Sequence, residues 1–205
     1  RQAMMERPDA RKAIGDGFAS LAAVAALIPA CPMVASLRGL EGAAARAHFG
    51  ALTALFAPEL GFMGRNRRPP RDPVNACLSL AYTMLHFDAV RAAHAAGLDP
   101  LLGFYHRPAF GRESLACDLI EVLRPHADAW VWQQFRSHNL RAEHFSQHNG
   151  ACVLGKAGRE HFYSAWEKSA KLPRRWLRAR CARLARNLRT DGSTWITSPD
   201  NDDEF

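Results

Sequence analysis

The 205-residue sequence has no long apolar run. A membrane-spanning helix needs about 20 mostly apolar residues, and the longest candidate, Leu21–Ile28, is short and rich in alanine. We expect this run to belong to a packed helix, and we expect no membrane-spanning segment. A basic leader followed by an apolar core is also missing after Arg1, so no secretory signal is predicted. The sequence is compatible with one part of a longer polypeptide.

Paired cysteines are missing as well. The five cysteines are scattered along the chain, and none of them forms a CxxC motif. An odd and dispersed set is typical of buried thiols in a reducing compartment, not of a disulfide framework. We therefore expect a cytoplasmic protein without a structural zinc site. The cysteines are Cys31, Cys77, Cys117, Cys152 and Cys181.

Valine, isoleucine, threonine and tyrosine are scarce, whereas alanine and leucine are abundant. These proportions favour helices over sheets, and the length suffices for one sizeable core. We predict an all-α fold with one short β-hairpin. Residues 1–190 are predicted to form a single helical domain. Residues 191–205 hold five acidic and no basic residues and are predicted to form a disordered tail.

Apolar spacing and the positions of proline divide the chain into predicted helices. Pro125 is expected to stop one helix and separate it from the next. Asn149–Gly150 is the strongest local turn signal and predicts a hairpin over residues 144–154. The helices are predicted at residues 9–28, 34–56, 73–96, 113–123, 127–137, 158–171 and 173–190.

The formal charge of +7 is unevenly distributed. Residues 171–190 hold one lysine and seven arginines without an acidic residue, and residues 64–71 hold four more arginines. Such patches predict a polyanionic partner, most simply nucleic acid. A solvated helix face is the alternative for residues 171–190. The arginines that we expect to contact DNA phosphates are Arg65, Arg67, Arg68, Arg71, Arg112, Arg175, Arg183, Arg186 and Arg189.

One stretch of the chain combines an imidazole with two carboxylates. His106 precedes Glu121 by fifteen positions, and Asp118 lies three residues before Glu121 on a predicted helix. Imidazole and carboxylate groups together suit a divalent metal ion. Glu41 is the candidate for a further ligand. The alternative is a solvated acidic helix face on which Glu121 pairs with Arg124, an interaction worth roughly 0.3 kcal/mol.

Four blocks of sequence resemble one family closely, in the same order and with similar spacing over about residues 20–190. The family is the CRISPR-associated integrase–endonuclease, the larger subunit of the complex that inserts new spacers into CRISPR arrays. Four blocks in register are far more specific than any one motif. They are LRGLEGAAAR at residues 37–46, PPRDPVNACL at 69–78, GLDPLLGFYH at 97–106 and GRESLACDLIEVLRP at 111–125.

The resemblance implies that Glu41, His106 and Glu121 hold a metal ion, Mg²⁺ or Mn²⁺. Asp118 falls on a further acidic position, where it supports this site or binds a second ion. Arg112 and Arg124 are expected to orient carboxylates or contact phosphate.

The resemblance also implies an activity and its partners. The activity is metal-dependent endonuclease and integrase chemistry, in which the 3′-hydroxyl ends of prespacer DNA are joined to the CRISPR repeat by transesterification. The partners are double-stranded prespacer DNA, repeat DNA and a small dimeric companion subunit, and the chain itself is expected to be a homodimer or larger.

The sequence departs from the family pattern at three points. Family members carry a small β-rich domain before the helical one, whereas residues 1–35 already predict helix. That domain has been lost or belongs to a larger fused polypeptide, which puts the dimer geometry and partner docking in doubt. His48 stands where the family usually has Tyr, and Ser79 where a second Asn is common. Neither change removes a predicted ligand.

Two other functions are open on the sequence. The first is a non-catalytic DNA-binding scaffold subunit of the same complex, which a strand-transfer assay distinguishes from an integrase. The second is a helical packing module within a fused polypeptide, which predicts no metal-dependent change in the melting temperature.

Overall fold

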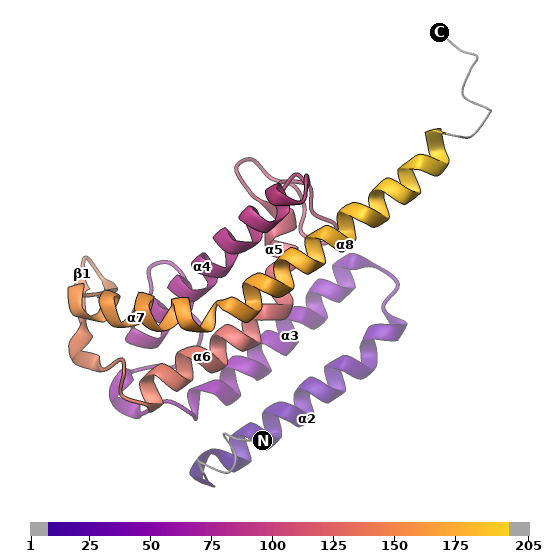
Figure 1. Ribbon diagram of the computed structural model, residues 1–205. Helices are drawn as coiled ribbons and strands as arrows, with labels where there is room; N and C mark the ends of the chain where they lie inside the picture. Colours follow the sequence, from indigo (N-terminus) through magenta and orange to yellow (C-terminus); the bar gives the residue numbers. More distant parts are fainter. Residues whose placement is uncertain (1–7, 197–205) are drawn as a thin grey trace. The chain divides into compact units, whose positions relative to one another are not determined.

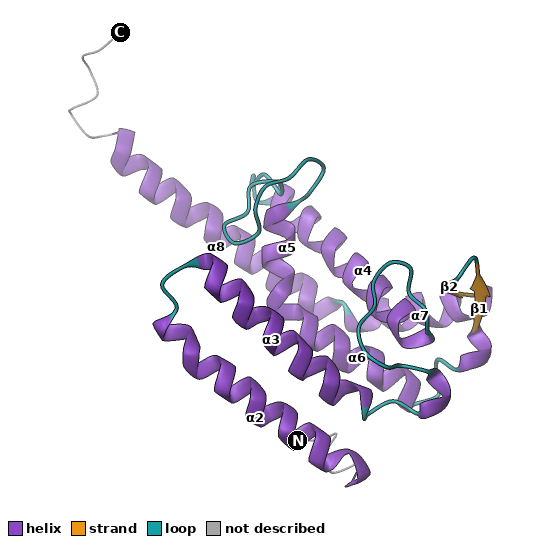
Figure 2. Ribbon diagram, turned by 180° about the vertical axis from the view of Figure 1, so that it is seen from behind, coloured by secondary structure: helices purple, strands orange, loops and turns teal. Residues whose placement is uncertain are grey.

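The structure is a computed structural model that describes the backbone of residues 8–196 and the side chains of residues 8–190. Within that range the fold is helical, with two short strands, as predicted (Figures 1 and 2). The strands are β1 (Phe145–His148) and β2 (Ala151–Leu154). The helices, with η marking a short 3-10 helix, are η1 (Pro8–Ala10), α2 (Arg11–Leu27), η2 (Ile28–Ala30), α3 (Val34–Thr53), η3 (Pro58–Leu60), α4 (Pro73–Ala95), α5 (Ser114–Ile120), η4 (Glu121–Leu123), α6 (Arg124–Arg136), η5 (Ala142–His144), α7 (Lys156–Ser169) and α8 (Lys171–Ile196).

Two predicted helix boundaries require correction. Pro125 was expected to separate two helices, but η4 leads directly into α6, and Pro125 lies in the first turn of α6. Proline lacks an N–H group, and the first turn of a helix does not need that donor. The last helix was predicted to fray after Thr190, but α8 continues to Ile196. Residues 197–205 of the predicted disordered tail lie outside the described residues.

The predicted hairpin is present at the predicted turn. β1 and β2 pair antiparallel, with Phe145 opposite Leu154 and His148 opposite Ala151. Both turn residues have positive φ angles, 48° at Asn149 and 76° at Gly150. Asn and Gly tolerate this left-handed backbone better than other residues, which is why the dipeptide predicts a two-residue hairpin turn.

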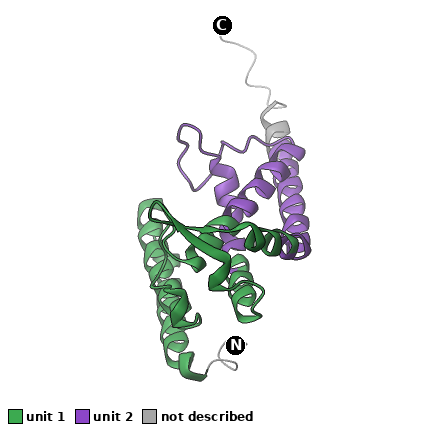
Figure 3. Cartoon of the chain, turned by 90° about the vertical axis from the view of Figure 1, so that its left-hand side faces the viewer, with its two compact units in different colours: residues 1–81, 126–164 green, residues 82–125, 165–205 purple. Residues whose placement is uncertain are grey.

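The described residues cluster into two compact units, each built from two stretches of chain (Figure 3). Of the described residues, unit 1 comprises 8–81 and 126–164, and unit 2 comprises 82–125 and 165–196. Each unit therefore depends on pairing between segments that are distant in sequence.

In unit 1, α2 lies beside α3 (Figures 1 and 2). Small residues permit a close approach, because a Cβ atom added to Gly17 would stand 2.6 Å from the Cβ atom of Ala51. The opposite side of α2 is exposed and partly apolar, and Phe18 is 56% exposed. An aromatic cluster lies elsewhere in unit 1, where Phe56 makes edge contacts with Phe62 and Phe135.

The segment Pro8–Ala30 corrects one sequence expectation. The segment has 23 residues, and an 18-residue stretch within it has a mean hydropathy of 1.6, so it is long and apolar enough to cross a membrane; only 11% of that stretch is buried. We predicted no such segment because we counted uninterrupted apolar residues, whereas averaged hydropathy tolerates Gly, Ser and isolated charges. A single helix of this kind near the N-terminus is weak evidence and does not assign a membrane location.

Unit 2 contains an ion-pair network around the buried carboxylate of Asp88, whose side chain is 2% exposed. Arg174 donates from Nε to Asp88 Oδ2 at 2.9 Å and from both terminal nitrogens to Glu167, at 2.6 and 2.7 Å. Arg91 also pairs with Asp88. The bonds to Glu167, ahead of those to Asp88, outweigh desolvation and raise the pKa of Arg174. Nearby, Leu177 and Cys181 of α8 are fully buried.

Candidate catalytic site

The site in unit 2 begins with a loop that closes around one buried carboxylate. The Asp118 side chain on α5 has no exposed surface. Its Oδ2 atom accepts hydrogen bonds from the backbone N–H groups of Phe104 at 2.7 Å and Tyr105 at 3.0 Å. Its Oδ1 atom accepts one from the His106 N–H at 2.9 Å. The carboxylate therefore shapes the three residues that end in His106.

The same carboxylate orients the His106 ring. His106 Nδ1 lies 2.6 Å from Asp118 Oδ1. An ionised carboxylate only accepts hydrogen bonds, so Nδ1 carries a proton, and in the neutral ring Nε2 then keeps its lone pair. Nε2 lies 3.8 Å from Glu121 Oε1. His106 and Glu121 thus place an imidazole nitrogen and a carboxylate oxygen side by side.

Asp118 stays ionised for a definable reason. Burial by itself would raise the pKa of this carboxyl group. The hydrogen bonds from Tyr105, His106 and Phe104 together outweigh burial and hold the pKa of Asp118 below its ordinary value. The loop and the carboxylate therefore stabilise each other.

Glu121 is held from its other side. It opens η4, and its Oε2 atom accepts a hydrogen bond from Arg124 Nε at 2.9 Å. The Arg124 guanidinium lies over the Tyr82 ring, 4.7 Å from the ring centroid. The two carboxylate oxygens of Glu121 thus have different neighbours, Arg124 and His106.

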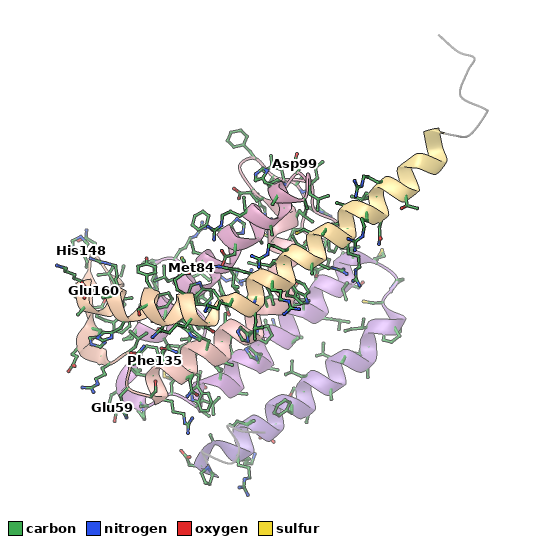
Figure 4. All side chains as sticks on the ribbon, viewed as in Figure 1. Glu59, Met84, Asp99, Phe135, His148 and Glu160 are labelled. Carbon is green, nitrogen blue, oxygen red and sulfur yellow. The ribbon has the colours of Figure 1, made fainter. Side chains whose placement is uncertain are left out.

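Gly103 permits the loop to approach α5. A Cβ atom at this position would lie 2.7 Å from both Asp118 Oδ2 and the backbone carbon of Ser114. The Ser114 hydroxyl adds a bond of 3.1 Å to the Arg107 carbonyl oxygen. The Leu115 N–H donates to the Pro100 carbonyl at 2.9 Å. The loop is therefore bonded to α5 at several points. Asp99, which precedes this loop, is labelled in Figure 4.

The structure brings together three of the four predicted site residues. His106, Asp118 and Glu121 meet in unit 2, whereas Glu41 is an exposed residue of α3 in unit 1. Among the described side chains, no three His, Cys, Asp or Glu residues form a ready-made metal-binding group. Glu41 stays a prediction as the third ligand.

The predicted DNA-contacting arginines fall into two classes. Arg65 is half-buried and donates to Asn75 Oδ1 at 2.8 Å and Ser79 Oγ at 3.0 Å, so its guanidinium holds the preceding loop against α4. The others have exposed side chains that can reach a ligand. These are Arg67, Arg68, Arg71, Arg112, Arg175, Arg183, Arg186 and Arg189.

Sequence reasoning missed Gly103 and Tyr82 at this site. Only the folded backbone around Asp118 shows why this position requires glycine, because a Cβ atom there would overlap Asp118 and Ser114. The Gly-Phe-Tyr-His stretch was noticed for its imidazole alone. A second pair was also missed in unit 1, where His48 Nε2 lies 2.8 Å from Asp128 Oδ2. No spacing rule connects residues eighty positions apart.

Known proteins resemble this chain over most of its length. A model of the family described as CRISPR associated protein Cas1 matches residues 1–168. The CRISPR-associated endonuclease Cas1 1 of Thermodesulfovibrio yellowstonii is 43% identical over 155 residues, which are 75% of this chain and 49% of that protein. The chain thus spans about half the length of this curated relative.

Two solved structures share the fold. A CAS1 protein from Thermotoga maritima superposes with a TM-score of 0.76 at 20% identity, covering 96% of this chain and 67% of that chain. A chain of a partial Cas6-RT-Cas1--Cas2 complex superposes with a TM-score of 0.80 at 25% identity, covering 93% of this chain and 60% of that chain. With the matched family model and the four sequence blocks in register, these likenesses place the chain in the family of CRISPR-associated Cas1 proteins.

Proposed function

We propose that this chain carries the phosphodiester-transfer centre of a metal-dependent DNA integrase and endonuclease of CRISPR adaptation. In this proposal it joins the 3′-hydroxyl ends of prespacer DNA to the CRISPR repeat. The observation that carries the proposal is the arrangement of Asp118, His106 and Glu121. One phosphodiester bond is broken as another forms, so the reaction needs no nucleotide cofactor.

The residues fit a divalent cation. Two ligands that each bind a common ion at about 2.1 Å stand roughly 3.0 to 4.2 Å apart, and His106 Nε2 and Glu121 Oε1 are 3.8 Å apart. A histidine that ligates a metal usually donates its other ring N–H to a carboxylate or carbonyl, and Asp118 accepts that bond here. His106 and Glu121 would hold Mg²⁺ or Mn²⁺, with Glu41 as the third proposed ligand.

When bound, the cation would polarise the scissile phosphate and lower the pKa of the attacking hydroxyl. The protein side chains supply the rest of the arrangement. Asp118 orients the His106 ring so that, when neutral, it offers Nε2 as an acceptor, and Glu121 places a carboxylate oxygen beside it. Asp118 already accepts four hydrogen bonds from the loop. Its geometry therefore favours the supporting role over binding of a second ion.

The exposed arginines would position DNA through its phosphates. If Z such contacts form, the logarithm of the affinity falls with the logarithm of salt concentration with a slope of about −0.9Z. Arg112 lies in the same loop region as His106, and the arginine face of α8 is a second proposed contact. The proposed partners are prespacer DNA, repeat DNA and a small companion subunit of the Cas2 type, with the chain itself a homodimer or larger.

A strand-transfer assay tests the proposal. A labelled duplex with 3′-hydroxyl ends is incubated with supercoiled plasmid carrying a CRISPR repeat, with Mn²⁺ or Mg²⁺, and with and without the companion subunit. We expect joined product from the unaltered chain and none after His106→Ala or Glu121→Ala. His126→Ala is the matched control, because His126 is an exposed histidine of α6 in unit 1.

The outcomes separate the alternatives. Equal joining by the unaltered chain and His106→Ala would refute the catalytic assignment. DNA binding without joining by any variant would instead favour the scaffold function. Glu41→Ala tests the third ligand, because the proposal predicts loss of joining with DNA affinity unchanged.

A further inference from the structure

The carboxylate of Glu121 is held by a clamp of two residues. Arg124 bonds to the carboxylate, and the Tyr82 ring lies against the Arg124 guanidinium. Glu121 and Arg124 are 31% and 26% exposed at their side chains, so this pair is not a fully solvated surface ion pair. Tyr82, on α4, is buried, with 9% of its surface exposed. Its ring supports the Arg124 guanidinium at 4.7 Å. Three residues from α4, η4 and α6 thus form one chain of contacts within unit 2.

The clamp distinguishes the two oxygens of Glu121. Arg124 donates to Oε2, while Oε1 faces His106 Nε2 at 3.8 Å. Without the arginine, the carboxylate could rotate about its terminal torsion, which is broad and roughly two-fold. A planar guanidinium stacked on a ring cannot follow such a rotation freely, and a flexible ammonium could.

We propose that Tyr82 and Arg124 are positioning residues that hold Oε2 of Glu121, so that the single oxygen Oε1 is presented beside His106 Nε2. The inference rests on the proposed function for what Oε1 would bind. The clamp itself consists of protein groups alone and can be tested without a metal ion. Tyr82 acts only through Arg124, and neither residue is proposed to touch DNA or the cation.

The first measurement needs no metal and no activity. In NMR spectra of ¹⁵N-labelled protein, the Arg124 Nε–H signal should be resolved and protected from solvent exchange by its bond to Glu121. Tyr82→Leu should shift this signal and speed its exchange at least fivefold, whereas Tyr82→Phe should leave both nearly unchanged because the ring remains. Exchange equally fast in the unaltered chain and in Tyr82→Leu would overturn the proposal.

The second measurement is Mn²⁺ binding, followed by the electron paramagnetic resonance signal of the free ion. Removing outer partners of a metal ligand usually weakens metal affinity or activity about 10- to 100-fold. We expect about tenfold weaker binding for Arg124→Lys and Tyr82→Leu, and a change within twofold for Tyr82→Phe. Arg124→Lys keeps the charge, so it isolates geometry from electrostatics. Arg136→Lys is the matched control, because Arg136 is an exposed arginine of α6 whose guanidinium likewise lies over a ring, that of Trp132.

The results separate this inference from the proposed function. If the unaltered chain binds no Mn²⁺, the metal site fails, while the exchange measurement still decides whether the clamp exists. If Mn²⁺ binds and Arg124→Lys binds it equally well, the clamp does not position Glu121 and the inference is wrong. Thermal unfolding of each variant shows whether any loss comes from a destabilised fold.

Discussion

Replacing Asp118 by Asn should loosen the loop that carries His106 and lower stability markedly. An amide has one acceptor oxygen, so its NH₂ group must face N–H donors that the carboxylate satisfied. Each oxygen of the Asp118 carboxylate accepts two of the four hydrogen bonds, so at least two bonds are lost. Bonds to a charged group contribute about 1.5 to 3 kcal/mol each. Allowing for relaxation of the loop, we expect a loss of about 3 kcal/mol, or roughly 6 to 12 °C in melting temperature for a chain of this size.

The pH dependence of this effect has a defined sign. The pKa of Asp118 is lowered in the folded chain relative to its ordinary value of 3.8. Its contribution is therefore fully present above the unfolded-state pKa and is lost as the pH falls through the folded-state pKa. The stability difference between the unaltered chain and Asp118→Asn should be constant between about pH 5 and 8 and should shrink below about pH 4.

The assay is urea unfolding followed by circular dichroism across this pH range, with amide hydrogen exchange of Phe104, Tyr105 and His106 at pH 7. Asp99→Asn is the matched control, because the same chemical change occurs in the same loop. Asp99 Oδ1 accepts only the Leu101 N–H at 2.8 Å, and an amide oxygen can replace it. If Asp118→Asn lies within about 0.5 kcal/mol of Asp99→Asn at pH 7, with unchanged exchange, the reasoning is refuted.

Two further predictions concern the close approach at Gly103 and the ion-pair network around Asp88. Gly103→Ala should lower the free energy of unfolding by about 1 to 3 kcal/mol, because the new methyl group overlaps Asp118 and the Ser114 backbone. Gly39→Ala is the control, because nothing lies within 4 Å of a Cβ atom added there. In urea unfolding we expect it to raise the free energy of unfolding by about 0.5 to 1 kcal/mol. Arg174→Met should lower stability by about 2 kcal/mol, because buried Asp88 loses a charge-assisted bond while Arg91 remains. Exposed Arg175→Met should change the urea midpoint little, and equal midpoints for the two arginine variants would contradict the network.

Local sequence signals predicted the helices and the hairpin well. The helix over 73–96 is observed as Pro73–Ala95, and Asn149–Gly150 forms the turn between β1 and β2. Both signals act within a few residues, through apolar spacing, first-turn proline and positive φ. Pro125 shows where such rules fail, because the same residue stops one helix or starts the next depending on where the chain turns.

The candidate site was predictable only in part. The sequence predicts His106, Asp118 and Glu121 as site residues, and they meet as a group in unit 2. The sequence did not predict that Asp118 is enclosed by three backbone N–H groups. Nor did it predict that Arg65 bonds to residues of α4, or that the Tyr82 ring lies against the Arg124 guanidinium. Backbone donors look alike in every sequence, so their partners cannot be read from residue types.

The sequence alone determined the helical class, the hairpin, the basic character and the chemical types at the site, because these depend on composition and on contacts between near neighbours. Only the tertiary structure decided which nitrogen of His106 faces Glu121. It also decided which oxygen of Glu121 accepts the hydrogen bond from Arg124. Those choices arise where the loop that carries His106 meets α5 and η4, and where Tyr82 of α4 meets the first turn of α6, through hydrogen bonds and ring contacts that act over a few ångströms. Residues distant in sequence come within that range only when the chain has folded.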